Sequence, residues 1–141
     1  MKLYRIIHKS LVHELSMHPG FGATISNDNA FLLAFDSFAM AVLEHPFYSL
    51  VLGFPTTFHV VIYGLPDTER KHITESPACL YEEREIGNRK LGSWVDVFLH
   101  NNTALCAEYQ SRDWPSQSNY VINIRHPLFS EVVIEETFAV K

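Results

Sequence analysis

The stretch FLLAFDSFAMAVLEHP, residues 31–46, contains the clearest change of local structure in the chain. Its first five residues are apolar and predict a short buried strand over residues 31–35. Asp36 or Ser37 can cap a following helix, because a short polar side chain accepts hydrogen bonds from the free N–H groups of the first turn. Pro46 ends this helix, since the residue before a proline disfavours the helical conformation.

One carboxylate, Glu44, lies in the last turn of this predicted helix. The C-terminal end of a helix favours cations, so the helix dipole does not explain an acidic residue there. Two interpretations follow from the residues alone. Glu44 either points into water, or the fold requires a carboxylate at this place.

Apolar segments on both sides of this stretch predict further strands. They lie at residues 2–7, 57–65, 103–109, 120–124 and 132–140, and the second of them is expected to be central because it lacks polar alternation. Ser93 can cap a helix that runs to residue 101. Residues 18–30, 66–90, 111–119 and 125–131 are expected to be loops or irregular, with room for one short helix in the second. The prediction is a compact single α/β (α+β) domain over residues 1–141, with a mixed sheet and short helices.

Composition narrows the classes of protein that the chain can represent. A length of 141 residues with 47% hydrophobic and 19% charged residues suits one folded domain. The net charge of −5 argues against direct nucleic-acid binding. The apolar stretch 30–55 is interrupted by charged residues and Pro46, and residues 1–15 lack the apolar core of a signal peptide. We therefore expect a cytoplasmic protein that does not enter the membrane.

Neither the cysteines nor the histidines form a recognisable metal motif. Cys79 and Cys106 lack CxxC spacing and are expected to be reduced thiols. His8, His13 and His18 are spaced by five residues, which does not place them on one helix face. No phosphate-loop, dinucleotide-binding or nucleophile-elbow motif is present in the chain. No metal site is predicted.

The order of several short motifs carries more information than any one of them. The chain contains LYRI, GFGA, S-x-A-x-A-x-x-E, GSW and SRDWPSQSNYVINIRHPLF in succession, and this order resembles the RES domain family over nearly the whole chain. The family is named for an arginine, a glutamate and a serine. The helix pattern is matched by Ser37, Ala39, Ala41 and Glu44. The last motif is matched by Ser111, Pro115, Asn119, Tyr120, Asn123, His126 and Pro127.

The resemblance implies a function and a partner. RES proteins are similar to ADP-ribosyltransferases in fold, and they are toxins of type II toxin–antitoxin pairs. They consume NAD+ as a substrate, without a metal, by hydrolysis or phosphorolysis of the nicotinamide–ribose bond, although one member modifies a protein. Their antitoxins are Xre-type helix-turn-helix proteins that cover the active site. The resemblance leaves open the acceptor of the ribosyl group and whether the protein forms a homodimer.

The resemblance also assigns residues. Glu44 takes the position of the catalytic glutamate, where a carboxylate can stabilise an oxocarbenium-like ribosyl cation. Ser111 takes the position of the serine, whose hydroxyl can bind the ribose or the nicotinamide amide. Arg5 matches the arginine of the first strand and is the candidate for binding the pyrophosphate. Asn119, Asn123 and His126 of the last motif are expected to hold the fold through turn and backbone hydrogen bonds.

The chain departs from the family pattern between the GFGA turn and the predicted helix. TISNDNAFLL (residues 24–33) replaces a family segment that contains an arginine, and Leu33 replaces a tyrosine. This departure supports an alternative, a catalytically degenerate RES-like domain that acts as a protein-binding module. A third interpretation is an acidic immunity-type protein that binds a basic toxin.

Overall fold

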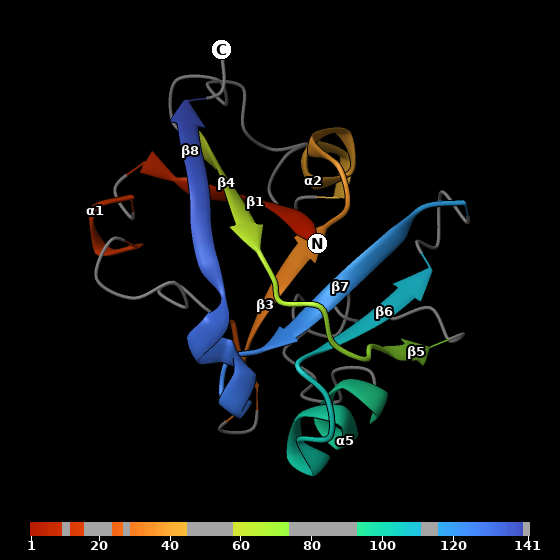
Figure 1. Ribbon diagram of the computed structural model, residues 1–141. Helices are drawn as coiled ribbons and strands as arrows, with labels where there is room; N and C mark the ends of the chain where they lie inside the picture. Colours follow the sequence, from red (N-terminus) through yellow and green to blue (C-terminus); the bar gives the residue numbers. More distant parts are fainter. Residues whose placement is uncertain are drawn as a thin grey trace.

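One mixed sheet organises the molecule, and two of its helices, over residues 38–44 and 93–101, lie on one of its faces (Figure 1). The computed structural model describes residues 1–9, 12–15, 24–26, 29–44, 58–73, 93–110 and 116–139. In these residues the fold is a compact α+β domain with a mixed sheet, which confirms the predicted fold class.

Six of the eight described strands lie in the predicted segments. They are β1 (Lys2–His8), β2 (Thr24–Ser26), β3 (Asn29–Phe35), β4 (Phe58–Gly64), β5 (Lys71–Ile73), β6 (Cys106–Gln110), β7 (Ser118–Asn123) and β8 (Val133–Ala139). Their order in the sheet is β5-β6-β7-β3-β1-β4-β8, and β2 pairs with β3. Within the described part, β5 and β6 are parallel and the other pairs are antiparallel.

The sheet has two halves, joined between β1 and β3. Strand β1 pairs with β4 along its whole length, from Lys2 to His8. Its described pairing with β3 is limited to Tyr4 and Phe35. The two halves therefore turn relative to each other (Figure 1). On one face of the sheet, here called the inner face, a single buried cluster contains side chains from both halves. Its members include Leu3, Ile7, Leu32, Val61, Tyr63, Cys106, Tyr120 and Ile122.

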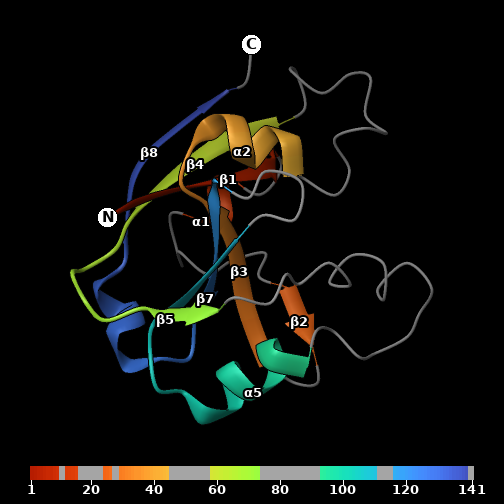
Figure 2. The same cartoon turned by 90° about the vertical axis from the view of Figure 1, so that its right-hand side faces the viewer.

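The opposite face, here called the outer face, is covered by two helices at separate places (Figure 2). Helix α2 (Phe38–Glu44) packs through Met40 and Ala41 against a cluster that includes Ile6 of β1. Helix α5 (Ser93–Asn101) packs against Phe31 and other residues of β3, β6 and β7. Alternation along each strand separates the faces, because successive side chains point to opposite sides.

The start of α2 confirms one of the two predicted caps. The backbone N–H of Met40 donates a hydrogen bond to Ser37 Oγ at 3.1 Å, and Ala41 N–H bonds to the Ser37 carbonyl at 3.1 Å. This is the geometry of an N-cap that satisfies the third residue of the helix. The helix is described as far as Glu44, and Pro46, which was expected to end it, lies outside the described residues.

Some regular structure lies in segments that were expected to be irregular. Strand β5 falls in residues 66–90, and β2 falls in residues 18–30. A further short helix, α1 (Val12–Leu15), was also not expected. Three or four residues are too few to show a periodicity. Strands β2 and β5 therefore form through pairing with a neighbouring strand rather than through a local pattern.

The C-terminal third contains smaller differences. Strand β7 begins at Ser118, two residues before the predicted segment, and β6 begins at Cys106 rather than at residue 103. The connection before β8 contains a 3₁₀ helix, η3 (Pro127–Glu131).

Candidate functional site

The two residues predicted to be catalytic lie at the limits of what is described. Glu44 is the last residue of α2, so its backbone lies on the side of the outer face, and its side chain is outside the described part. Ser111 also lies outside the described residues. Its neighbour Gln110 ends β6 and pairs with Ser118 of β7.

Arg5 lies on the inner face of β1, opposite α2. Its Nη1 donates a hydrogen bond to Tyr63 Oη at 3.1 Å, and Tyr63 is fully buried in the inner cluster. Its neighbour Ile6 points the other way and packs beneath α2. The structure therefore does not bring the Arg5 side chain onto the face that α2 covers.

The last sequence motif forms contacts that hold the fold. Asn123 is 1% exposed, its Nδ2 donates to Asn102 Oδ1 at 2.7 Å, and its Oδ1 accepts from the backbone N–H of Arg125 at 3.0 Å. His126 Nδ1 accepts from the backbone N–H of Leu128 at 3.1 Å and caps η3. Asn119 is fully buried. These contacts confirm the expected structural role of Asn123 and His126.

A polar cluster that sequence reasoning missed lies on the inner side of β5, β6 and β7, and Glu108 is at its centre. Tyr120 Oη donates to Glu108 Oε2 at 3.1 Å, and Arg70 Nη1 lies 3.6 Å from the same oxygen. His72 Nδ1 lies 3.4 Å from Glu108 Oε1. Arg70 Nη1 also reaches the sulfur of Met1 at 3.2 Å and Tyr120 Oη at 3.4 Å.

Strand register creates this Glu108 cluster. Glu108 is paired with Tyr120 on one side and with His72 on the other, so three strands contribute to it. The chain start is held to the same region, because the amino group of Met1 donates to the Leu65 carbonyl at 3.1 Å. A glutamate in the middle of an apolar strand was the available sequence signal, but its partners follow only from the register.

Burial and charge raise the pKa of two groups here. Burial, the charge of Glu108 and the hydrogen bond to Glu108 together raise the pKa of Tyr120 to about 12, against a lowering by Arg70. Burial raises the pKa of the Cys106 thiol to about 11, with a smaller lowering by Arg70. At neutral pH both groups keep their protons. Tyr120 therefore acts as a hydrogen-bond donor to Glu108. Cys106 is a buried, free thiol of low reactivity.

The raised pKa of Tyr120 predicts alkaline sensitivity. The folded protein holds this proton more tightly than the unfolded chain, so the stabilisation is complete below pH 10 and is lost as pH rises through about 12. Tyr120→Phe is expected to lower the free energy of unfolding at pH 8 by about 1 kcal/mol. It should also flatten the fall in stability above pH 10. Urea unfolding of both proteins at pH 8 and pH 11 measures this, and parallel pH profiles would contradict it.

The described residues lack a metal-binding cluster and a membrane-spanning helix. Their histidine, cysteine, aspartate and glutamate side chains include no group of three or more that could hold a metal ion. None of the helices described there combines the length and apolarity needed to cross a bilayer.

Comparisons with known proteins do not add a family to these observations. No model of a known protein family matches the chain, and no curated protein matches it significantly.

Proposed function

We propose that the protein is a RES-type toxin that depletes NAD+ by cleaving the bond between nicotinamide and ribose. The observation that carries the proposal is α2, whose Ser37 cap and final residue Glu44 coincide with the two ends of the S-x-A-x-A-x-x-E pattern. The contacts of Asn123 and His126 add support, because they give the last motif the structural role expected of it.

The proposed reaction needs a carboxylate and an acceptor. The bond between ribose C1′ and the nicotinamide nitrogen breaks, and its electron pair leaves with nicotinamide. Glu44 stabilises the ribosyl cation that develops. Water or phosphate then attacks C1′, and the acceptor loses a proton to Glu44 or to solvent. Ser111 is proposed to hold the ribose or the nicotinamide amide.

The same proposal implies a partner protein and a cellular compartment. An Xre-type helix-turn-helix protein would act as the antitoxin, and the cytoplasm would be the place where NAD+ is consumed. Arg5 remains the candidate for the pyrophosphate, which it would have to meet on the inner face of β1.

The position of Arg5 favours a second candidate function. Its guanidinium is bonded to Tyr63 on the face opposite α2, and Leu33, which replaces the family's tyrosine, is partly buried against the cluster beneath α5. The Arg5 side chain is thus directed away from α2, and the tyrosine of the family pattern is absent. A degenerate RES-like domain that binds a protein partner would explain both observations.

Nicotinamide release distinguishes the two functions. The purified protein is incubated with NAD+, with and without phosphate, and free nicotinamide is followed by proton NMR. Release is expected under the first proposal, and its dependence on phosphate separates phosphorolysis from hydrolysis. If NAD+ stays intact and calorimetry detects no binding, the protein-binding function is favoured and the enzymatic proposal fails.

A further inference from the structure

Strand β8 forms one edge of the sheet. In the described part of the chain it pairs with β4 on one side, and six of its seven residues are exposed. An edge strand presents unpaired backbone N–H and C=O groups that can accept another strand. The side chains on β8 then decide which strands can pair with it.

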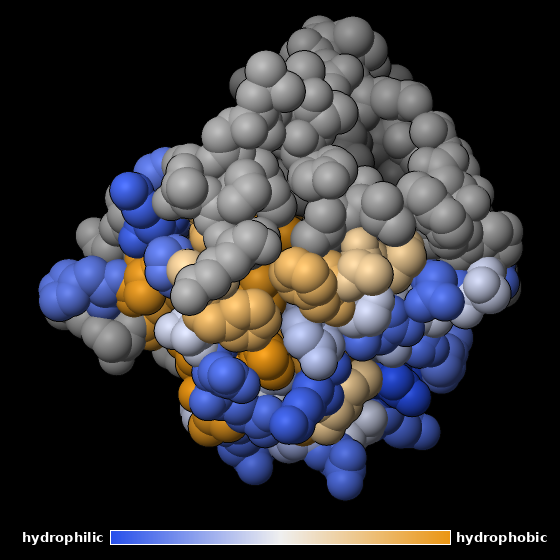
Figure 3. Space-filling model, turned by 90° about the horizontal axis from the view of Figure 1, so that it is seen from above, coloured by the Kyte–Doolittle hydropathy of each residue, from blue (hydrophilic) through white to orange (hydrophobic). Residues whose placement is uncertain are grey.

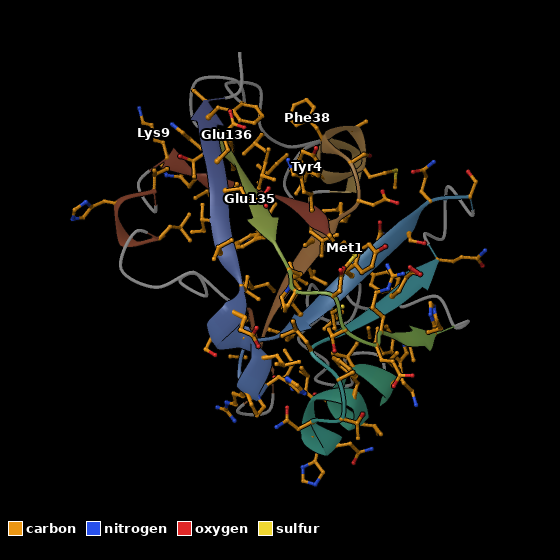
Figure 4. The ribbon with its side chains drawn as sticks, in the orientation of Figure 1. Met1, Tyr4, Lys9, Phe38, Glu135 and Glu136 are labelled. Atoms are coloured by element: carbon orange, nitrogen blue, oxygen red, sulfur yellow. The ribbon has the colours of Figure 1, made fainter. Side chains whose placement is uncertain are left out.

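A β-bulge brings two carboxylates of β8 to the outer side. Ile62 pairs with Glu136 and Tyr63 pairs with Ile134, so Glu135 is an extra residue between them. The Glu135 carboxylate lies over Gly64, where an added Cβ would be 2.5 Å from Oε1, and it reaches Lys2 Nζ at 3.4 Å. Both glutamates are exposed on β8 (Figure 4).

An aromatic pair lies beside these carboxylates on the outer face. Phe138 of β8 and Phe38 of α2 are each 38% exposed, and their ring centroids are 6.3 Å apart. Phe138 and Glu136 are two residues apart and therefore share a face. Seen from above, apolar side chains gather in the middle of the described surface, and hydrophilic ones lie beside and below them (Figure 3).

The charges on β8 select against a second copy of the same strand. Antiparallel pairing of two β8 strands centred on Glu136 would place this residue opposite itself, and like charges directly opposite are destabilising. Described β8 contains no lysine or arginine, and the whole chain carries a net charge of −5. The same charges favour a strand that presents basic side chains.

We propose that the β8 edge binds an extended, basic segment of a partner protein by strand addition. The segment would place a lysine or arginine beside Glu136 and an apolar residue, two positions away, beside Phe138 and Phe38. Backbone hydrogen bonds would supply the affinity, and the alternating side chains would supply the specificity. This inference does not depend on the proposed NAD+ chemistry.

A designed peptide tests the proposal. The probe is acetyl-Thr-Lys-Thr-Val-Thr-Lys-Thr-amide, which places lysines and a valine on one face in either strand direction. Binding is followed by NMR, and the largest shifts and the slowest amide exchange are expected along residues 133–139. Glu136→Lys should weaken binding about tenfold and should favour the same peptide with glutamate in place of lysine.

Two controls make the test specific. Glu131→Lys changes the net charge equally but lies in η3 rather than on β8, so we expect less than about a twofold effect through screened, long-range attraction. A peptide methylated on alternate backbone amides keeps its charge but loses strand-pairing donors, and it should not bind. Equal binding of the methylated peptide, equal effects of both variants, or no shift along β8 would overturn the proposal.

Discussion

Replacing Glu44 with glutamine is expected to lower the rate of nicotinamide release by about 10²- to 10³-fold, the usual effect of removing one electrostatic contact to a transition state. Glutamine keeps the size of the side chain and removes its charge, so the developing ribosyl cation loses its counter-charge. Because Glu44 ends α2, the substitution also removes an anion from the end of a helix that disfavours anions. Thermal stability should therefore be unchanged or slightly higher.

This combination separates catalysis from folding. Glu131→Gln is the matched control, since Glu131 is an exposed glutamate at the end of η3, and it should retain full activity. The measurement is the initial rate of nicotinamide release with the melting temperature of each variant. If Glu44→Gln releases nicotinamide at the rate of the unchanged protein, Glu44 is an ordinary helix-end residue and the proposed mechanism is wrong.

Replacing Asn123 with alanine is expected to lower the free energy of unfolding by about 1–3 kcal/mol, because a buried side chain loses two hydrogen bonds. One of the bonding partners is Asn102, the residue after α5. Asn102 adopts a left-handed conformation with φ of 53°, and its N–H bonds to the Phe98 carbonyl at 3.1 Å. Asn123 thus anchors the residue that ends α5.

Asn102→Gly provides the matched comparison. Glycine keeps the left-handed conformation and loses only the bond from Asn123 Nδ2, so a loss of about 1 kcal/mol or less is expected. Urea unfolding followed by far-ultraviolet circular dichroism gives both values. A loss below about 0.5 kcal/mol for Asn123→Ala would show that water replaces its contacts and that the motif does not stabilise the fold.

Local patterns predicted most of the strands. Residues 58–64 form an interior strand because their apolar run suits burial on both faces, and the Ser37 cap follows from a short polar residue before an apolar helix. The same reasoning missed β5, whose residues Lys71–Ile73 are mostly polar and exposed. That strand exists through its pairing with β6.

The candidate site, like the strands, was predictable only where near neighbours in the chain determine it. The helix that carries Glu44 and its Ser37 cap were correctly predicted, because capping and periodicity act within a few residues. Which face of β1 carries Arg5 relative to α2 was not predictable, since alternation separates Arg5 from Ile6 without indicating which of them a helix will cover.

The sequence by itself determined the fold class, the position of most elements and the start of α2 after Ser37, because these depend on interactions between near neighbours in the chain. Only the tertiary structure decided that Arg5 bonds to Tyr63 and that Glu108 contacts Arg70 and Tyr120. The same holds for the bulge in β8, which places Glu135 on the same side of the sheet as Glu136. The physical reason is strand register. A shift of one residue would send each of these side chains to the other face, and that register is set by packing between segments that lie far apart in the sequence.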